Sequence, residues 1–375
     1  MALRRTALLP ARLARRALRG WRVQRRLRAG EALRPRPWWV QIGIDDRCNY
    51  RCAMCWAHSP LLPSQPHANT LPRAEFERLI RDLQQLGARR IEVCGSGEPM
   101  LHQDALPMIR LVKELGMECV VITNGSRLSE PVCVEFVDMG LDALAVSVHA
   151  GTDEAHRAIT GAPLGERRRI MQILGHIVRL RDQGQAAVPS VGVIAVLQKA
   201  NYRELVRLAE EAAELRLDNL EFASLGINPA SAGLALSPEE GEEATKQVVG
   251  ADAIMRAVGK GTNAAAFLGR PRETEWTRRV FQSMPCYIGQ FFCRVNANGE
   301  VNPCCGCSRV VGSISGQSFA QIWRSETYRL FRREALSLPE RCEPVAECRC
   351  YTCGHYPFIV QYHEDLTAGR FANLL

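Results

Sequence analysis

Hydrophobic and polar positions between residues 38 and 226 follow two different periods. Short runs with a period of two, such as Val40, Ile42 and Ile44, are typical of half-buried strands. Between these runs lie longer segments with an apolar residue every three or four positions, which is the pattern of amphipathic helices. The predicted strands are 40–44, 91–94, 119–122, 144–148, 191–197 and 220–223, and the predicted helices are 73–86, 106–115, 129–139, 167–181 and 202–215. A further helix is expected to begin near Ser237, whose hydroxyl can cap it.

Strands that alternate with helices predict a parallel sheet, because a crossover helix returns the chain to run in the same direction. Right-handed crossovers curl such a sheet, so six units predict an α/β fold built as a partial (βα)6 barrel of the TIM type. Functional groups in these barrels lie at the carboxyl ends of the strands. Four successive predicted strands are each followed by a cysteine-rich or polar segment between residues 45 and 150, so we expect all four segments at one mouth.

The pattern changes after about residue 280, where predicted strands become short and cysteine, glycine and proline become frequent. This change predicts a small cysteine-rich module that is held together by metal. We therefore divide the chain into an N-terminal arm (1–37), the barrel (38–245), a connecting segment (246–280) and a C-terminal module (281–375).

Positive charge is concentrated in the arm, which holds twelve arginines and one acid, so the net charge of +8 leaves the rest of the chain mildly acidic. Six of these arginines fall on one helical stripe: Arg12, Arg15, Arg16, Arg19, Arg22 and Arg26. This basic amphipathic pattern predicts contact of residues 1–28 with an anionic membrane surface; a transit peptide and a solvated arm without a specific role are the alternatives. No nucleic-acid partner is expected, because the body of the protein is not basic.

Nine of the fifteen cysteines lie between residues 286 and 353. Tight cysteine groups in a chain of this size favour metal clusters over disulfides, which are typical of small secreted domains. We therefore expect a reducing compartment, the cytoplasm, with a position at the membrane surface if the arm binds lipid. Cys94, Cys119 and Cys133 stand apart from the groups and are predicted to be buried apolar residues.

The loop after the first predicted strand contains Cys48, Cys52 and Cys55 in the spacing CxxxCxxC. Three thiolates within eight residues can surround one corner of a [4Fe–4S] cluster, and the lack of a fourth cysteine nearby in sequence leaves one iron open. Zinc is the alternative metal, although zinc sites usually combine CxxC pairs or histidines.

The segment CNYRCAMC resembles the signature of the radical S-adenosylmethionine (SAM) superfamily. Three later segments resemble motifs of that family in the same order: GSGEP at 95–99, TNG at 123–125 and SVHA at 147–150. Ser96 replaces a glycine of the family's GGEP segment, and His149 with Ala150 replaces the more common Asp-Gly. The resemblance covers roughly residues 38–226.

This resemblance implies a [4Fe–4S] cluster on the three cysteines that gives an electron to SAM and cleaves it. The resulting 5′-deoxyadenosyl radical then removes a hydrogen from a substrate. The implied SAM contacts are Gly95, Ser96, Gly97, Glu98, Asn124 and Ser147. The glycines leave room for the methionine part, Glu98 can accept from its ammonium group, and contact with the ribose falls to Ser147. An electron donor such as flavodoxin or ferredoxin is also expected.

The C-terminal cysteines resemble the SPASM module of radical SAM enzymes, or its shorter twitch form, which carries auxiliary [4Fe–4S] clusters. Asn298-Gly299 predicts a hairpin turn within this region, and GSISGQSFAQIW matches the module's usual sequence. For one auxiliary cluster that assists the reaction we predict the ligands Cys286, Cys304, Cys350 and Cys353. A second cluster is the alternative for Cys293, Cys305, Cys307, Cys342 and Cys348, whose spacing departs from the full SPASM pattern. The CxxC pair would equally allow zinc.

Three functions compete on this evidence. The first is oxidation, crosslinking or epimerisation of a peptide or protein side chain, although the 37 residues before the barrel are too few for a fused leader-binding domain. The second is a dehydrogenase or epimerase for a small molecule, such as a sugar or a glycan precursor. The third, a non-catalytic zinc-binding interaction protein, is disfavoured by the ordered SAM motifs. No catalytic residue is assigned, because His58, His149 and Glu221 near the mouth are interpreted as core or solvated groups.

Overall fold

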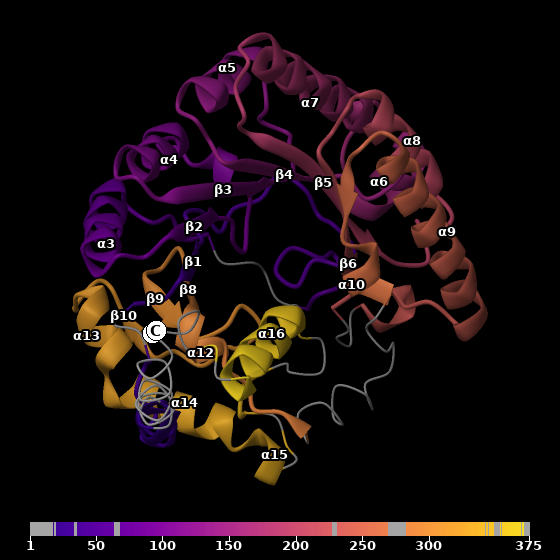
Figure 1. Cartoon of the computed structure of the whole chain (residues 1–375). Coiled ribbons are helices and arrows are strands. Elements are labelled where there is room, and N and C mark those ends of the chain that lie inside the picture. The colour runs from indigo at the N-terminus through magenta and orange to yellow at the C-terminus, as the bar shows by residue number, and fades with distance from the viewer. Residues whose placement is uncertain are drawn as a thin grey trace, which may run out of the picture.

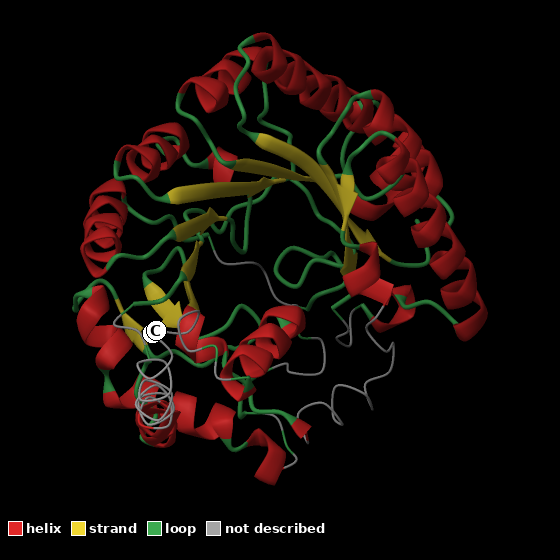
Figure 2. Ribbon diagram, viewed as in Figure 1, coloured by secondary structure: helices red, strands yellow, loops and turns green. Residues whose placement is uncertain are grey.

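The computed structural model describes residues 18, 20–33, 36–63, 68–226, 231–268, 283–341, 343, 345–348, 353, 355–368 and 370. These residues form an α/β structure in which a strongly curved sheet is lined on its outer side by helices (Figures 1 and 2).

One sheet runs through the described part of the chain in the order β10-β9-β8-β1-β2-β3-β4-β5-β6-β7. Its strands are β1 (Trp39–Ile42), β2 (Arg90–Val93), β3 (Glu118–Thr123), β4 (Ala143–Ser147), β5 (Ser190–Leu197), β6 (Asn219–Ser224), β7 (Gly261–Thr262), β8 (Phe292–Val295), β9 (Glu300–Asn302) and β10 (Gly312–Ser313). The run from β8 through β1 to β7 is parallel throughout. The six predicted barrel strands and their parallel order are therefore confirmed.

Burial along the strands shows which side of the sheet faces which neighbour. In β4, Leu144 and Val146 are fully buried, whereas Ala143, Ala145 and Ser147 are only half-buried. Because side chains alternate between the two faces of a strand, the buried residues pack against the outer helices and the half-buried ones face the barrel interior. The interior of this open barrel is thus partly accessible.

The outer layer consists of α3 (Arg73–Leu86), α4 (Ala105–Glu114), α5 (Glu130–Asp138), α7 (Glu166–Gln183), α8 (Leu205–Glu214) and α9 (Pro238–Ala257). Shorter pieces are η1 (Pro99–Leu101), α6 (Asp153–Thr160), η2 (Ala232–Leu234) and α10 (Ala264–Leu268). The predicted start near Ser237 is confirmed, since Ser237 and Glu240 form a reciprocal capping box. The predicted boundary at residue 245 falls inside α9, which continues without a break.

The C-terminal cysteine region extends the sheet of the barrel rather than forming a separate one. Strand β8 pairs in parallel with β1, and β9 and β10 follow as antiparallel strands. The predicted hairpin turn is confirmed between β8 and β9, where Gly299 has φ +81° in the left-handed region. Around these strands lie α12 (Ile288–Phe291), α13 (Phe319–Arg324), α14 (Glu326–Leu336), α15 (Leu338–Arg341) and α16 (Tyr356–Thr367).

The described part of the N-terminal arm packs against this C-terminal region. Residues 20–28 are helical, and Val23 and Leu27 are buried in the common core. The chain then passes so close to α14 that a Cβ at Gly30 would overlap the carbonyl oxygen of Arg329. Membrane contact through residues 1–28 gains no support, because Leu27, which lies off the arginine stripe, points into the protein; residues 1–17 lie outside the described residues.

Within the described residues, none of the helices combines the length and the apolar character that crossing a lipid bilayer requires.

Candidate active site at the mouth of the barrel

The three cysteines of the CxxxCxxC loop converge after β1, as the spacing predicted. Burial raises the pKa of Cys52 to about 12, and the neighbouring thiols of Cys55 and Cys48 contribute to the shift. Burial also raises the pKa of Cys48, with a contribution from the nearby Cys55. The thiols of Cys48 and Cys55 are near enough to Cys52 to add to its shift, and a bound cation would have the opposite effect by stabilising the thiolates.

Donors around the loop are arranged to hydrogen-bond to the cysteine sulfur atoms. The backbone N–H of Tyr50 donates to Cys48 Sγ at 3.5 Å, and those of Ala57 and His58 donate to Cys55 Sγ at 3.4 and 3.2 Å. Hydrogen bonds of this kind stabilise thiolates and tune the potential of iron–sulfur clusters. Three converging cysteines with N–H donors on their sulfurs therefore fit a [4Fe–4S] cluster.

The cysteine loop is held in place by α6 and α7. The N–H groups of Arg51 and Ala53 donate to the carbonyl oxygens of Thr160 and Ile159 at 3.0 and 2.8 Å. The hydroxyl of Tyr50 donates to Glu166 Oε1 at 3.0 Å. Helix α6 was not predicted from the sequence, and the structure shows that it braces the cysteine loop.

The two glycines of the GSGEP segment allow close contact between two parts of the chain itself. A Cβ at Gly97 would overlap the carbonyl oxygen of Arg47, and one at Gly95 would lie 2.8 Å from the Cα of Gly43. Gly97 therefore packs directly on the backbone that leads into the cysteine loop. The prediction that these glycines leave room for SAM stays a prediction, but their contacts with residues 43–47 already require glycine.

Replacing Gly97 with alanine is expected to displace the cysteine loop, because the added methyl group would overlap backbone atoms that cannot swing away. We expect a loss of about 1–3 kcal/mol in the free energy of unfolding and a lower iron content after reconstitution. Gly316→Ala is the matched control, since a Cβ there meets nothing within 4 Å. Urea denaturation and iron analysis would measure both effects, and equal behaviour of the two variants would contradict the prediction.

Glu98 is buried in the loop after β2, where it caps η1, and it bridges to the end of β3. Its carboxylate accepts hydrogen bonds from Thr123 Oγ1 at 2.5 Å, from the N–H of Asn124 at 2.6 Å and from the N–H of Met100 at 3.0 Å. Burial raises the pKa of Glu98, and these three donors oppose the shift. Glu98 thus fixes the TNG segment beside the cysteine loop, and its contact with the SAM ammonium group remains a prediction.

The other predicted SAM contacts lie at neighbouring strand ends. The side-chain amide of Asn124 donates to Asn49 Oδ1 at 2.9 Å and approaches Cys48 Sγ at 3.8 Å, so Asn124 also ties the third strand to the cysteine loop. Ser96 and Ser147 line a cavity at the mouth of the barrel. The structure therefore brings together the four motifs that the sequence placed after successive strands.

This cavity has a volume of about 750 Å³ and is bounded by both halves of the protein. On one side lie Cys52 and Cys55 with the strand-end residues Ser96 and Ser147. On the other side lie Cys305 and Glu347 from the C-terminal region. The volume is in the range of ligand sites, so a bound molecule would contact both cysteine groups.

Arg294 on β8 supplies a cation to the cavity wall and was not predicted as a site residue. Its side chain is 6% exposed, its Nη2 donates to Ser96 Oγ at 3.0 Å and its guanidinium lies 5.1 Å from the ring centroid of Trp56. Its buried Nε has no acceptor among the described residues. A buried guanidinium N–H in this situation offers a donor to an oxygen of a bound ligand.

The three residues interpreted as core or solvated groups have different surroundings. His58 is buried, with Nε2 2.8 Å from the carbonyl oxygen of Asp46. His149 lines the cavity, and burial lowers its pKa to about 3, so its imidazole is neutral near pH 7. Glu221 on β6 is exposed as a whole, but partial desolvation of its carboxyl group and the nearby carboxylate of Glu92 raise its pKa. Of these three residues, His149 is the one that lines the cavity.

A second group of metal-binding side chains lies in the C-terminal region. The ligand atoms of Cys304, Cys305 and His355 all lie within 4.8 Å of one another. A hydrogen bond with Cys305 and then burial raise the pKa of Cys304, and the nearby thiol of Cys353 adds to the shift. The predicted ligands Cys304 and Cys353 are therefore brought together. His355 was missed, and its only sequence signal was its position two residues after Cys353.

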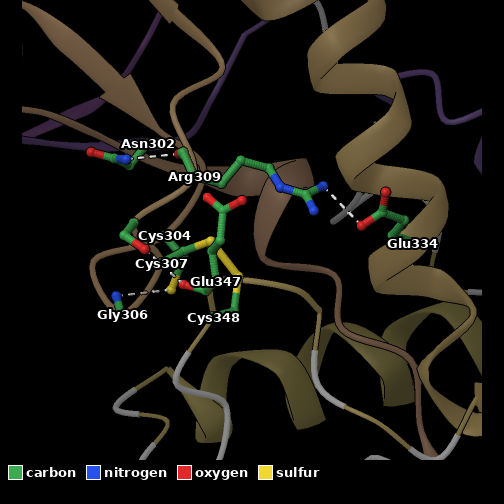
Figure 3. The surroundings of a disulfide bond; sticks show 9 residues. Asn302, Cys304, Gly306, Cys307, Arg309, Glu334, Glu347 and Cys348 are labelled. Carbon is green, nitrogen blue, oxygen red and sulfur yellow. Dashed lines mark hydrogen bonds and ion pairs between the residues drawn. A yellow bond between two sulfur atoms is a disulfide. The ribbon is translucent and has the colours of Figure 1, made fainter.

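Cys307 and Cys348 are joined by a disulfide bond in this structure (Figure 3). The two residues face each other in an isolated antiparallel bridge, with their Cα atoms 4.0 Å apart. The expectation that the grouped cysteines serve clusters rather than disulfides is wrong for this pair. Residues 41 positions apart meet because two loops of the C-terminal region lie side by side, which local spacing did not reveal.

The remaining predicted ligands have different positions. Cys293 is fully buried in β8, on the face opposite Arg294, and burial raises its pKa, so it packs in the core rather than beside the other thiols. Cys286 is buried just before α12. Cys342 and Cys350 lie outside the described residues. Of the isolated cysteines, Cys119 and Cys133 are buried as predicted, while Cys94 is half-buried and donates to Glu92 at 3.3 Å.

Two family models match this chain. The model described as the radical SAM superfamily matches residues 42–212, and the model described as an iron–sulfur cluster-binding domain, SPASM, matches residues 286–353. The first match covers strands β2 to β5 and all four motifs of the strand ends. The second covers the cysteine region that bounds the other side of the cavity.

Curated relatives include proteins with different functions. A tungsten-containing aldehyde ferredoxin oxidoreductase cofactor-modifying protein of Pyrococcus furiosus is 24% identical over 312 residues, covering 78% of this chain and 83% of that protein. A probable GTP 3′,8-cyclase of Thermococcus kodakarensis is 34% identical over 122 residues, covering 32% of this chain. The matched segment spans only 38% of that cyclase.

Solved structures with the same fold include SuiB of Streptococcus suis. The crystal structure of SuiB bound to S-adenosylmethionine has a TM-score of 0.61 at 15% identity, covering 80% of this chain and 68% of SuiB. SuiB bound to its precursor peptide SuiA has a TM-score of 0.60 at 14% identity, covering 85% of this chain and 71% of SuiB. At this identity the likeness concerns the fold alone.

Proposed function

Because this chain is a radical SAM enzyme with a C-terminal SPASM module, we propose that it abstracts a hydrogen atom from a substrate held in the cavity between its two cysteine groups. The observation that carries this proposal is that Cys52, Cys55, Ser96 and Ser147 line the same cavity as Cys305 and Glu347. A substrate in that cavity would contact the SAM site and the auxiliary site together.

The family implies a [4Fe–4S] cluster with SAM and an auxiliary cluster, which would supply the radical chemistry. The residues of this chain would bind and orient the reactants. Cys48, Cys52 and Cys55 would hold the first cluster, and Ser96 and Ser147 would contact SAM at the strand ends. Arg294 would bind a carboxylate or carbonyl oxygen of the substrate, because its Nε has no acceptor among the described residues. The enclosing wall from the C-terminal region would limit access of water.

For the substrate we propose a side chain of a peptide or protein. The fold it shares with SuiB, which was solved with a precursor peptide, supports this choice. The open mouth of the partial barrel would admit an extended segment. A nucleotide, sugar or cofactor precursor is the alternative, supported by the names of the Pyrococcus and Thermococcus relatives. The electron donor, flavodoxin or ferredoxin, also remains a proposal.

Transfer of deuterium into 5′-deoxyadenosine would test the substrate class before the substrate itself is identified. Extract from cells grown in heavy water is divided by ultrafiltration into macromolecules and small molecules, and each fraction is incubated anaerobically with reconstituted enzyme, SAM and a reductant. We expect mass spectrometry to find deuterated 5′-deoxyadenosine with the macromolecular fraction. Deuteration by the small-molecule fraction alone would favour the alternative.

A Cys52→Ala variant is the control for deuterium that enters 5′-deoxyadenosine independently of the enzyme. If the complete enzyme cleaves SAM but neither fraction transfers deuterium above that control, hydrogen abstraction itself is contradicted.

A further inference from the structure

His355 lies where two cysteine-bearing loops of the C-terminal region meet. One loop, after β9, carries Cys304 and Cys305, and the other leads through Cys353 into α16. The Nε2 atom of His355 lies 3.1 Å from the Sγ atom of Cys305. With Cys304 included, the three possible ligand atoms lie within 4.8 Å of one another.

The imidazole ring is fixed in a buried aromatic environment. His355 is 6% exposed, and its ring centroid lies 4.3 Å from that of Phe292 and 5.3 Å from that of Trp39. Phe292 and Trp39 are partners in the pairing of β8 with β1, so the junction of the two sheet halves holds the ring. A ring held in this way directs Nε2 at the thiols with little loss of freedom on binding a metal.

The described residues near the meeting point of the loops offer both thiols and an imidazole as donors, while the predicted ligand Cys350 lies outside the described residues and Cys286 is buried just before α12. Cys307 and Cys348 are joined to each other, and Cys293 faces the core. Near the meeting point of the loops, Cys304, Cys305 and Cys353 are the remaining described thiols. A [4Fe–4S] cluster usually has four protein ligands, and histidine replaces cysteine on one iron in some iron–sulfur proteins.

We propose that His355 is a ligand, through Nε2, of the auxiliary iron–sulfur cluster, beside Cys304 and Cys305. A histidine ligand binds a metal as the neutral imidazole, so it would leave the site less negative than a fourth thiolate would and make the auxiliary site easier to reduce. Of these ligands Cys305 lines the cavity, so the auxiliary site would border the proposed position of the substrate. This assignment goes beyond the proposed function and is independent of the substrate's identity.

Isotope labelling tests whether His355 is a ligand while every residue of the C-terminal region is left unsubstituted. In a Cys48→Ala, Cys52→Ala, Cys55→Ala background, only the auxiliary site can hold a cluster. Pulsed electron paramagnetic resonance of the reduced protein is expected to show a nitrogen coupling that changes when histidine carries ¹⁵N. A cluster signal without histidine nitrogen coupling, or zinc with no acid-labile sulfide in this background, would overturn the proposal.

Variants in the same background provide a second measurement. His355→Ala is expected to lose the histidine coupling together with most of the iron and sulfide, whereas His355→Cys should retain iron without the coupling and shift the midpoint potential to a more negative value. His363→Gln is the matched control, because His363 is on α16 and its Nδ1 lies 3.0 Å from the hydroxyl of Tyr287. It is expected to keep the coupling, the iron and the potential. Full iron and an unchanged spectrum in His355→Ala would contradict the assignment.

Discussion

A Cys52→Ala enzyme is expected to form no detectable 5′-deoxyadenosine from SAM. Cys52 lies between Cys48 and Cys55 in the loop, and its thiol is the one whose pKa is raised to about 12 by burial and its two neighbours. Removing one of three protein ligands leaves a site that cannot hold the cube and still present an open iron. We expect the protein to lose about four irons and about four sulfides per chain, the content of one [4Fe–4S] cluster.

Iron and sulfide analysis after anaerobic reconstitution, with chromatography of 5′-deoxyadenosine, would measure these losses. Cys133→Ala is the matched control, because Cys133 is fully buried on α5 and has no part in either cysteine group. It is expected to keep the full iron content and SAM cleavage and to lose only some stability. Normal SAM cleavage by Cys52→Ala would exclude the assigned cluster.

An Arg332→Ala enzyme is expected to lose about 3–5 kcal/mol of its free energy of unfolding, as large buried side chains do on truncation. Arg332 on α14 is 2% exposed and donates to the carbonyl oxygens of Gly289 and Trp323 at 2.8 and 2.9 Å. Its guanidinium lies 4.0 Å from the ring centroid of Tyr328 and 4.4 Å from that of Trp323. Truncation would leave two buried carbonyl groups without their donors and open a cavity between two aromatic rings.

The neighbouring Arg333 offers a control on the same helix. Its side chain is 38% exposed and pairs with Glu326, so Arg333→Ala is expected to cost about 0.5 kcal/mol or less. Anaerobic urea denaturation followed by circular dichroism would compare the two variants. A similar small loss for Arg332→Ala would mean that the C-terminal region does not depend on this buried guanidinium.

The cysteine loop of the barrel is linked to the C-terminal region through neighbouring strands. Strand β8 pairs with β1, and β1 leads directly into the cysteine loop. Arg294 on the same β8 donates to Ser96 in the GSGEP segment. The cysteine loop and the C-terminal region are therefore joined through one strand pair and one buried guanidinium.

Much of the barrel could be predicted because its signals are local. The periods of two and 3.6 identified the six strands and their outer helices, and Ser237 marked the start of α9. The three-cysteine loop was found for the same reason, since its ligands lie within eight residues. The short helix α6 was missed, and its role in bracing the cysteine loop follows from contacts between residues about a hundred positions apart.

The sequence by itself determined the fold class, the cysteine loop and the order of the SAM motifs, because each depends on residues that are close along the chain. Only the tertiary structure decided that β8 continues the barrel sheet, that Arg294 faces the same cavity as Ser147, and that His355 meets Cys305. It also decided that Cys307 pairs with Cys348 and that Cys293 faces the core. The physical reason is that these relations depend on strand pairing and on which face a side chain occupies. For residues 40 or more positions apart, the spacing of cysteines specifies neither the strand pairing nor the face that a side chain occupies.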